Sequence, residues 1–321
     1  MKWIDGHIDL AYVALQGRNI LKKCSKGSNQ CISIPDLEQS PIQTFCGTIY
    51  SSPRDGVCGY GSIDNLEKAS SVGIKQLEIY NKLEQQGHIS IQRTGCTLDD
   101  YLSVLLLMEG ADPITKPSDV TWWKSQGLRA VGLTWSAGTR YAGGNSSGGP
   151  ITYSGIELIS ALDQEKIVHD ASHLSDAAFD GLINNATGKI IASHSNSRAV
   201  LNSKSERHLN DDQANEIFKR GGVIGLNLCT QFLSPTFDKD NYTASIDDCV
   251  SHIMHYCEIA GNKTQVALGS DFDGGFSTKY LPDNLKHPNQ MCNLTDALKK
   301  AGFTNEELDS FAHGAWMKIF S

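Results

Sequence analysis

The sequence predicts an α/β fold in which eight parallel strands close into a (β/α)8 TIM barrel. The chain has 321 residues, a length that fits one large barrel or two ordinary domains. Short apolar segments alternate with stretches of helical character, a pattern typical of a parallel sheet covered on both faces. Eight such units favour the barrel, and no break in composition requires a second domain. We therefore predict one domain over residues 1–321.

The predicted strands are short runs rich in Val, Ile and Leu. They are residues 3–9, 44–50, 103–108, 128–134, 166–172, 189–193, 222–227 and 265–270. Helical character is found at 64–86, 155–164, 175–186, 211–220 and 244–260. Residues 88–93 also resemble a strand, and we assign them to a connection. The Gly/Ser-rich run 142–149 directly follows a predicted strand, which favours a mobile βα loop over a linker.

Composition limits the classes of partner. The net charge is −8 with 28 Lys and Arg, and no clustered basic patch is visible, which disfavours nucleic acid. No apolar run is long enough to span a bilayer. The predicted first strand begins at once, without a leader, so we expect a cytoplasmic protein, or an exported one if a leader was removed. The nine cysteines form no CxxC pair, and we expect reduced thiols, with a bridge among the first four possible on export.

The first predicted strand carries an unusual set of polar side chains. Residues 4–10 read IDGHIDL, and the alternation of a strand places Asp5, His7 and Asp9 on one face. Burying a carboxylate costs several kcal/mol unless it is paired, hydrogen-bonded or bound to metal. The run is therefore a candidate ligand set, although a single His-x-Asp occurs by chance.

Titratable residues also close other predicted strands. In a barrel the chemistry lies at the carboxyl ends of the strands, and five of the eight end in a histidine or a carboxylate. These residues are His7, Asp9, Glu109, His173, His194 and Asp271. Singly, His194 could be a core histidine, Glu109 a solvated residue and Asp271 a helix N-cap. Together they would converge on one rim, where carboxylates repel one another unless a cation lies between them.

The combination of imidazole and carboxylate ligands favours zinc or another borderline divalent ion over calcium or magnesium. The number of ligands allows two ions. One would take His7 and Asp9, the other His173 and His194, with Glu109 bridging them. A hydroxide held between two such ions is a strong nucleophile near neutral pH. The pattern therefore predicts a metal-dependent hydrolase.

Seven motifs carry a resemblance to a known family. They are DGHIDL, EG after an apolar strand, DASHLSD, ASHSNSRAV, RHLNDDQ, GGVIGLN and GSDFDGG. In this order, from residue 5 to about residue 275, they resemble the membrane (renal) dipeptidase family, peptidase family M19 of the amidohydrolase superfamily. The resemblance implies a (β/α)8 barrel with two zinc ions that hydrolyses dipeptides, often with a D-residue at the C-terminal position. It also implies a possible homodimer.

The resemblance assigns roles to individual residues. His7 and Asp9 would hold one zinc, His173 and His194 the other, and Glu109 would bridge them. By the same resemblance, catalysis would use Asp271 as acid/base beside a bridging hydroxide, and substrate binding would use Arg207 and Trp135. The planar, two-pronged guanidinium of Arg207 suits the C-terminal carboxylate of a dipeptide.

The chain departs from the family pattern at two places. Many members have LTH at the end of the fourth strand, where this chain has LTW and thus Trp135, a change expected to affect substrate choice. Ala315 stands where an asparagine is usual, which we interpret as packing or helix capping. Of the other histidines, we expect His169 and His313 to be structural, and His208 could approach the substrate.

Two alternatives remain at this stage. The barrel could act on another C–N bond, such as that of a β-lactam or an N-acyl amino acid. It could also be a non-catalytic ligand-binding homologue, although all the inferred ligands are present.

Overall fold

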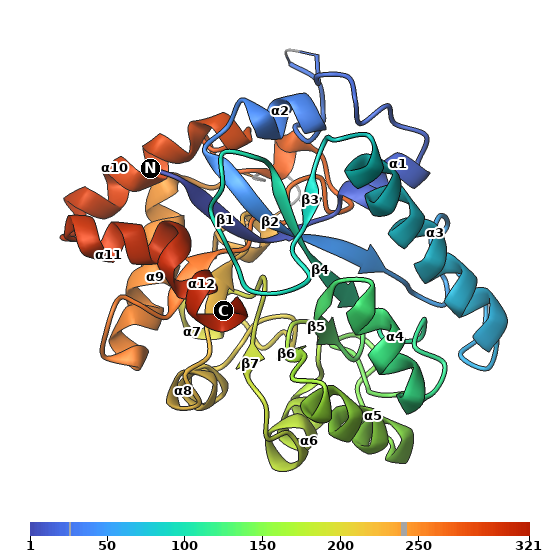
Figure 1. The fold of residues 1–321 in the computed structure, drawn as a ribbon. Helices are drawn as coiled ribbons and strands as arrows, with labels where there is room; N and C mark the ends of the chain where they lie inside the picture. Colours follow the sequence, from blue (N-terminus) through green and yellow to red (C-terminus); the bar gives the residue numbers. More distant parts are fainter. Residues whose placement is uncertain (26, 239–242) are drawn as a thin grey trace.

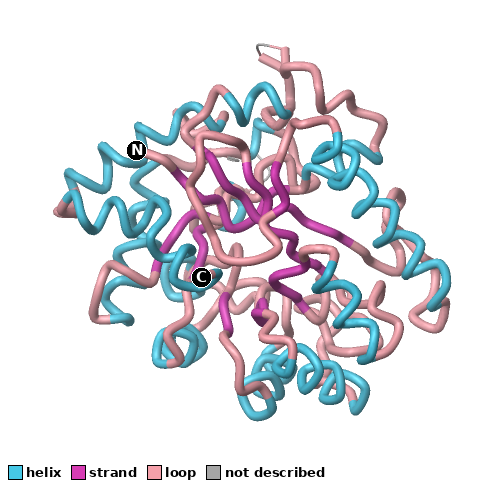
Figure 2. The backbone as a smooth tube through the Cα atoms, in the orientation of Figure 1, coloured by secondary structure: helices cyan, strands magenta, loops and turns pink. Residues whose placement is uncertain are grey.

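The computed structural model describes residues 1–25, 27–238 and 243–321. In these residues eight parallel strands form a nearly closed barrel, surrounded by helices (Figures 1 and 2). The strands follow one another in the order β7-β6-β5-β4-β2-β1-β9-β8. A parallel bridge between Ala192 and Ile224 joins the two ends of this path. The predicted barrel is confirmed.

The barrel strands match the predicted segments closely. They are β1 (Trp3–Ile8), β2 (Ile42–Tyr50), β4 (Ser103–Glu109), β5 (Leu128–Gly132), β6 (Val168–Asp170), β7 (Ile190–Ile191), β8 (Ile224–Leu226) and β9 (Val266–Leu268). The connection that includes residues 88–93 contains a two-residue strand, β3 (Ser90–Ile91), which pairs with β4 outside the barrel path. Strands β6 and β7 are shorter than predicted. There, the Asp170 side chain accepts the backbone N–H groups of Ser172 and Ser193, where the sheet ladder would otherwise continue.

The helices connect the strands and cover the barrel. They are α1 (Leu10–Leu15), α2 (Ile34–Glu38), α3 (Leu66–Gln85), α4 (Val120–Ser125), α5 (Tyr153–Gln164), α6 (Asp176–Asn185), α7 (Arg198–Leu201), α8 (Asp211–Lys219), α9 (Ile246–Ala260), α10 (Met291–Lys300), α11 (Asn305–Asp309) and α12 (Ala315–Phe320). Between α11 and α12 the chain forms a π-helical turn, Ser310–Gly314. Side-chain caps fix several starts, such as the reciprocal Ser245–Asp248 capping box of α9. The five predicted helices correspond to α3, α5, α6, α8 and α9.

The C-terminal helix contributes a large side chain to the apolar interior of the barrel. Trp316 on α12 is fully buried, and its indole N–H donates to the Leu268 carbonyl at 2.8 Å. A Cβ on Gly6 would lie 2.5 Å from this indole, so the glycine makes room for it. Ala315 is also fully buried in the same apolar cluster, which agrees with the interpretation of that position as packing.

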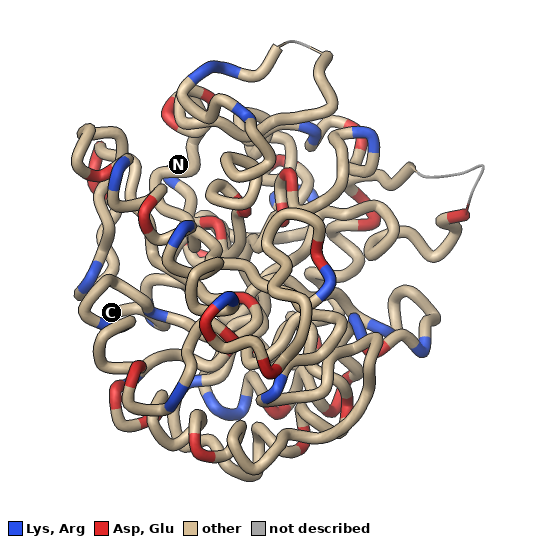
Figure 3. Tube along the Cα trace, turned by 90° about the vertical axis from the view of Figure 1, so that its right-hand side faces the viewer, with Lys and Arg blue, Asp and Glu red and all other residues tan. Residues whose placement is uncertain are grey.

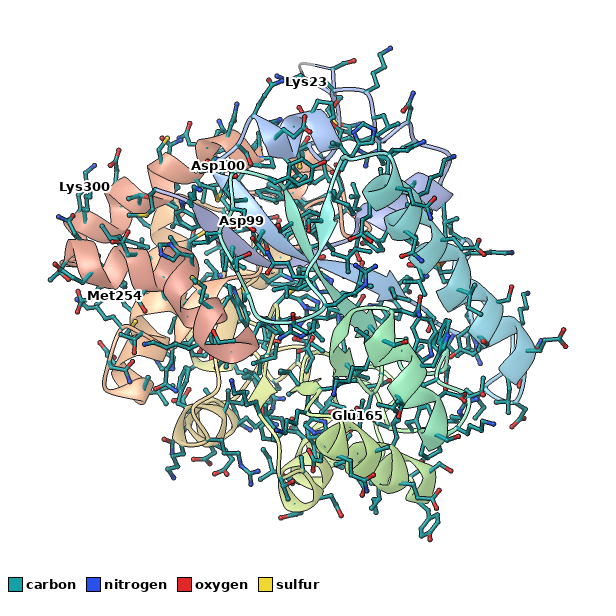
Figure 4. The ribbon with its side chains drawn as sticks, in the orientation of Figure 1. Lys23, Asp99, Asp100, Glu165, Met254 and Lys300 are labelled. Carbon is teal, nitrogen blue, oxygen red and sulfur yellow. The ribbon has the colours of Figure 1, made fainter. Side chains whose placement is uncertain are left out.

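The surface of the barrel carries charges of both signs. Figure 3 shows Lys and Arg interspersed with Asp and Glu along the trace. Lys23 and Lys300 lie at the outer edge of the molecule (Figure 4), and both are exposed. None of the helices in the described part of the chain combines the length and apolar character that a membrane crossing needs.

The packing of Trp316 generates a prediction about stability. Trp316→Ala leaves a cavity between the sheet and α12 and removes the hydrogen bond to the Leu268 carbonyl, so we expect it to lower the free energy of unfolding by about 3–5 kcal/mol. The matched control is Trp122→Ala on α4, where the side chain is 46% exposed, and where we expect a loss of about 0.5 kcal/mol. Denaturant unfolding measures both. Equal losses would contradict the central role of Trp316.

Candidate metal centre and active site

The six residues singled out at the strand ends meet at the carboxyl end of the barrel. His7 lies on β1 and Asp9 directly after it, and Glu109 is the last residue of β4. The other three follow β6, β7 and β9 in the loops that lead away from the barrel. All six are buried. They are His7, Asp9, Glu109, His173, His194 and Asp271.

One oxygen of Glu109 lies at the centre of three imidazoles. Its Oε1 is 3.0 Å from His173 Nε2, 3.4 Å from His194 Nε2 and 3.8 Å from His7 Nε2. Tetrahedral ligands at zinc-like bond lengths lie about 3.4 Å apart. The spacing of these four side chains is therefore that of a ligand set.

A second group adjoins the first through His7. Its Nε2 is 3.8 Å from Asp9 Oδ1, and ligand atoms of His7, Asp9 and Asp271 all lie within 4.8 Å of one another. His7 Nε2 is buried and has no hydrogen-bond partner among the described residues. The orphaned nitrogen points to a cation that His7 shares with the carboxylates.

Burial sets the protonation of the site. It raises the pKa of Glu109 well above its usual range, and the neighbouring Asp9 and Asp271 add to the shift. Burial likewise raises the pKa of Asp9 to about 6 and lowers that of His7 to about 3. Neutral imidazoles with free lone pairs and mutually repelling carboxylates are a combination that divalent cations stabilise.

The orientation of His173 supports the same conclusion. Its Nδ1 lies 3.0 Å from Asn145 Oδ1, an oxygen that only accepts, so Nδ1 carries the proton and Nε2 presents a lone pair. That Nε2 is 3.0 Å from His194 Nε2. Glu109 Oε1 also lies within 3.4 Å of both nitrogens, so three acceptor atoms lie next to one another. The donor set therefore fits a bound cation.

Two of these residues adopt backbone conformations that non-glycine residues rarely adopt. His173 has φ of +67° and Asp271 has φ of +60°, in the left-handed region that costs about 1 kcal/mol or more. Next to Asp271, a Cβ on Gly274 would lie 1.7 Å from Asp271 Oδ1. The strained turns aim these side chains at the centre, and the glycine lets the chain pass beside them.

The carboxyl end of the barrel opens into a cavity of about 550 Å³. Its wall includes Asp9, Glu109, Trp135, His173, His194, Arg207 and Asp271. Trp135, half-buried, lies 5.8 Å from the His173 ring and 5.4 Å from the Tyr50 ring, centroid to centroid. The sequence-predicted substrate-binding residues thus share one cavity with the predicted ligands.

Arg207 is a buried cation without an anionic partner among the described residues. It donates to Ser195 Oγ at 3.2 Å and to the His194 carbonyl at 2.8 Å, and it lies over the Phe232 ring. Its Nε has no hydrogen-bond partner among the described residues. Burial lowers the pKa of Arg207. An anion in the cavity would compensate this charge.

Three other titratable residues, on β1, on β6 and in the π-helical turn before α12, make contacts outside the ligand cluster. Asp5 does not join the ligand cluster: its Oδ1 accepts the N–H groups of His7 and Ser270, and burial raises its pKa to about 6. His169 contacts Asp163 at 2.6 Å, and His313 donates to the Lys2 carbonyl at 3.1 Å.

The remaining expectations have mixed outcomes. His208 packs on the Phe232 ring and is not part of the cavity wall. All nine cysteines, each of which lies in the described residues, are free thiols.

The Gly/Ser-rich run 142–149 is a βα loop as predicted, but hydrogen bonds hold it to the neighbouring loop. Gly144 bridges to Leu174, and the Asn145 N–H donates to the His173 carbonyl at 2.8 Å.

Several residues that support the site were not predicted. Asn145 orients His173, Asn227 Nδ2 donates to Asp271 Oδ2 at 2.8 Å, and Thr48 donates to Asp9. Asp273 accepts from Arg18 at 2.7 Å and from the Ile32 N–H at 3.0 Å, and so ties the loop after α1 to the loop after β9. Only Asp273 has a sequence signal, its place close to Asp271 in GSDFDGG.

Comparison with known proteins identifies relatives of this chain. The family model described as membrane dipeptidase (peptidase family M19) matches residues 1–321. An uncharacterized protein in the pqqA 5' region of Klebsiella pneumoniae is 30% identical over 70% of this chain and 83% of its own length. An uncharacterized dipeptidase of Schizosaccharomyces pombe is 29% identical over 96% of this chain and 77% of its own.

Solved structures share the fold. A metallo peptidase from Rhodobacter sphaeroides, liganded with a phosphinate mimic of the dipeptide L-Ala-D-Ala, superposes with a TM-score of 0.87 at 23% identity. The match covers 100% of this chain and 98% of that chain. A dipeptidase described as a metallo peptidase of family M19 gives a TM-score of 0.86 at 23% identity, with the same coverage. Because the family model spans residues 1–321, the chain belongs to the membrane dipeptidase family, peptidase family M19, and is a metal-dependent dipeptidase with an amidohydrolase-type barrel.

Proposed function

We propose that this protein is a two-zinc dipeptidase that hydrolyses free dipeptides, including those with a D-residue at the C-terminal position. The observation that carries the proposal is the convergence of three imidazole nitrogens on Glu109 Oε1, beside a buried arginine that lacks an anion. A metal centre and a carboxylate receptor then share one cavity. The Rhodobacter metallo peptidase, which binds a mimic of L-Ala-D-Ala, supports the D-residue.

The proposed ligand sets follow the family resemblance, with Glu109 common to both. His7, Asp9 and Glu109 would hold one ion, and Glu109, His173 and His194 would hold the other. Imidazole and carboxylate ligands without thiolate suit zinc. Bound divalent ions at such a site supply Lewis acidity and lower the pKa of water, so that a nucleophile is available near neutral pH.

Asp271 is proposed to move the proton. Its Oδ2 accepts a hydrogen bond from Asn227 Nδ2, and the residue is part of the cavity wall. Burial and the charge of Asp9 raise the pKa of Asp271, so this carboxyl can hold a proton taken from water. It then passes the proton to the leaving amine, which would otherwise depart as an unstable anion.

Arg207 is proposed to bind the C-terminal carboxylate of the dipeptide. Its guanidinium can form two parallel hydrogen bonds to a carboxylate, and burial strengthens them. A longer peptide would place its next residue where this carboxylate lies, so the same contact excludes it. Trp135 on the cavity wall is proposed to contact the substrate and to influence which side chains fit.

Metal content and turnover test the proposed function together. We expect about two zinc ions per chain and hydrolysis of L-Ala-D-Ala that stops with a chelator and returns with zinc. Elemental analysis and a dipeptide panel measure these quantities. Less than one ion per chain, with turnover that a chelator leaves unchanged, would refute the proposal.

The carboxylate contact is tested by Arg207→Ala. Removing one member of a desolvated charge pair costs about 2–5 kcal/mol, so we expect kcat/KM for a dipeptide to fall at least roughly thirty-fold. A dipeptide amide lacks the carboxylate, and its slow turnover should change little. The control is Arg93→Ala, whose side chain pairs with Glu84 on the surface. Equal losses on the acid and the amide would exclude the proposed contact.

A further inference from the structure

One buried hydroxyl lies behind two of the proposed metal ligands. Ser193 follows β7 and is fully buried. Its Oγ is 2.7 Å from His194 Nδ1 and 3.4 Å from His7 Nδ1, the ring nitrogens that face away from the centre. On its other side it lies 2.5 Å from Asp170 Oδ2. The rings of His7 and His194 stack, with centroids 3.7 Å apart and planes at 29°.

The direction of these hydrogen bonds follows from Asp170. Its Oδ1 already accepts the N–H groups of Ser172 and Ser193, at 3.0 Å and 2.9 Å. The Ser193 hydroxyl donates its single proton to Asp170 Oδ2. The Ser193 oxygen can then only accept from the two histidines. Its fourth polar neighbour, Ser172 Oγ, is 3.4 Å away.

This arrangement fixes the tautomer of both imidazoles. Protons on the two Nδ1 atoms leave a lone pair on each Nε2, and a metal ligand must present such a lone pair. His173 reaches the same state independently, through Asn145 Oδ1. Of the three ligand histidines, two therefore share one orienting hydroxyl and the third has its own partner.

We propose that Asp170 and Ser193 are positioning residues that orient His7 and His194 together and so link the affinities of the two metal positions. The proposal rests on the proposed function, because there His7 and His194 belong to different ions. Asn145 orients only His173, which belongs to one of the two metal positions. Loss of the Asp170–Ser193 pair should therefore weaken both ions, and loss of Asn145 should weaken one.

The test uses Asp170→Asn in the full-length chain. The amide oxygen can still accept the two backbone N–H groups, so the turn is retained. Its NH2 group donates to Ser193, which sends the hydroxyl proton towards His194 Nδ1 and moves the imidazole proton to Nε2. Titration with zinc against a competing chromophoric chelator measures both dissociation constants, and Asp170→Asn should raise that of the ion at His194 about 10–100-fold. Ser193→Ala should change both in the same direction, and Asn145→Ala should change one of them.

A second readout does not require bound metal. Two-bond 1H–15N spectra of the folded, metal-stripped chain report which imidazole nitrogen carries the proton. In the wild type we expect His7 and His194 to be protonated at Nδ1, with His194 changing to Nε2 in Asp170→Asn. Wild-type zinc affinities in Asp170→Asn, or an unchanged tautomer, would overturn the inference. A wild-type chain that binds no zinc would refute the proposed function instead, and the tautomer spectrum would still decide the role of Asp170.

Discussion

The structure depends on one electrostatic constraint: buried carboxylates and imidazole lone pairs converge on a small volume at the mouth of the barrel. Glu109 Oε1 lies within 3.8 Å of three imidazole nitrogens, and burial, together with the carboxylates of Asp9 and Asp271, raises the pKa of Glu109. The cluster contains more acceptors than donors. Protonation of the Nε2 atoms would relieve this imbalance, but it would remove their lone pairs. The hydrogen bonds that Ser193 and Asn145 make to the Nδ1 atoms preserve these lone pairs. A divalent cation satisfies all of these groups at once.

Closure of the sheet is what brings these residues together. The ligands come from the ends of β1, β4, β6 and β7, which are far apart in the chain. The barrel in turn needs a filled interior, and Trp316 on the last helix packs there with side chains of the strands, in the space that Gly6 leaves free. The short strands β6 and β7 connect the barrel to the metal-ligand cluster. Asp170 interrupts the ladder there and supports the turns that carry His173 and His194.

The strands and the ligand cluster could be predicted from the sequence because each depends on a strong local pattern. Apolar runs define the strands, and the residue that closes a run must lie at the rim. Alternation alone did not place Asp5 correctly. It shares a face with His7 on an ideal strand, yet its carboxylate turns to the backbone N–H of Ser270 on the neighbouring segment. Side-chain hydrogen bonds of this kind are set by tertiary contact.

The supporting residues were beyond sequence reasoning for the same reason. Asn145 and His173 are 28 residues apart, and an asparagine in a Gly/Ser-rich loop has no feature that marks it as an orienting group. The isolation of Arg207 from carboxylates is likewise a property of the folded chain, since a sequence rich in Asp and Glu offers many partners.

Anomalous diffraction at the zinc edge, from crystals grown with zinc, tests the central claim most directly. The account predicts two peaks on either side of Glu109, one beside His7 and Asp9 and one beside His173 and His194, with Asp271 outside bonding distance of both. An empty site, or zinc bound elsewhere while the six side chains keep their positions, would contradict it.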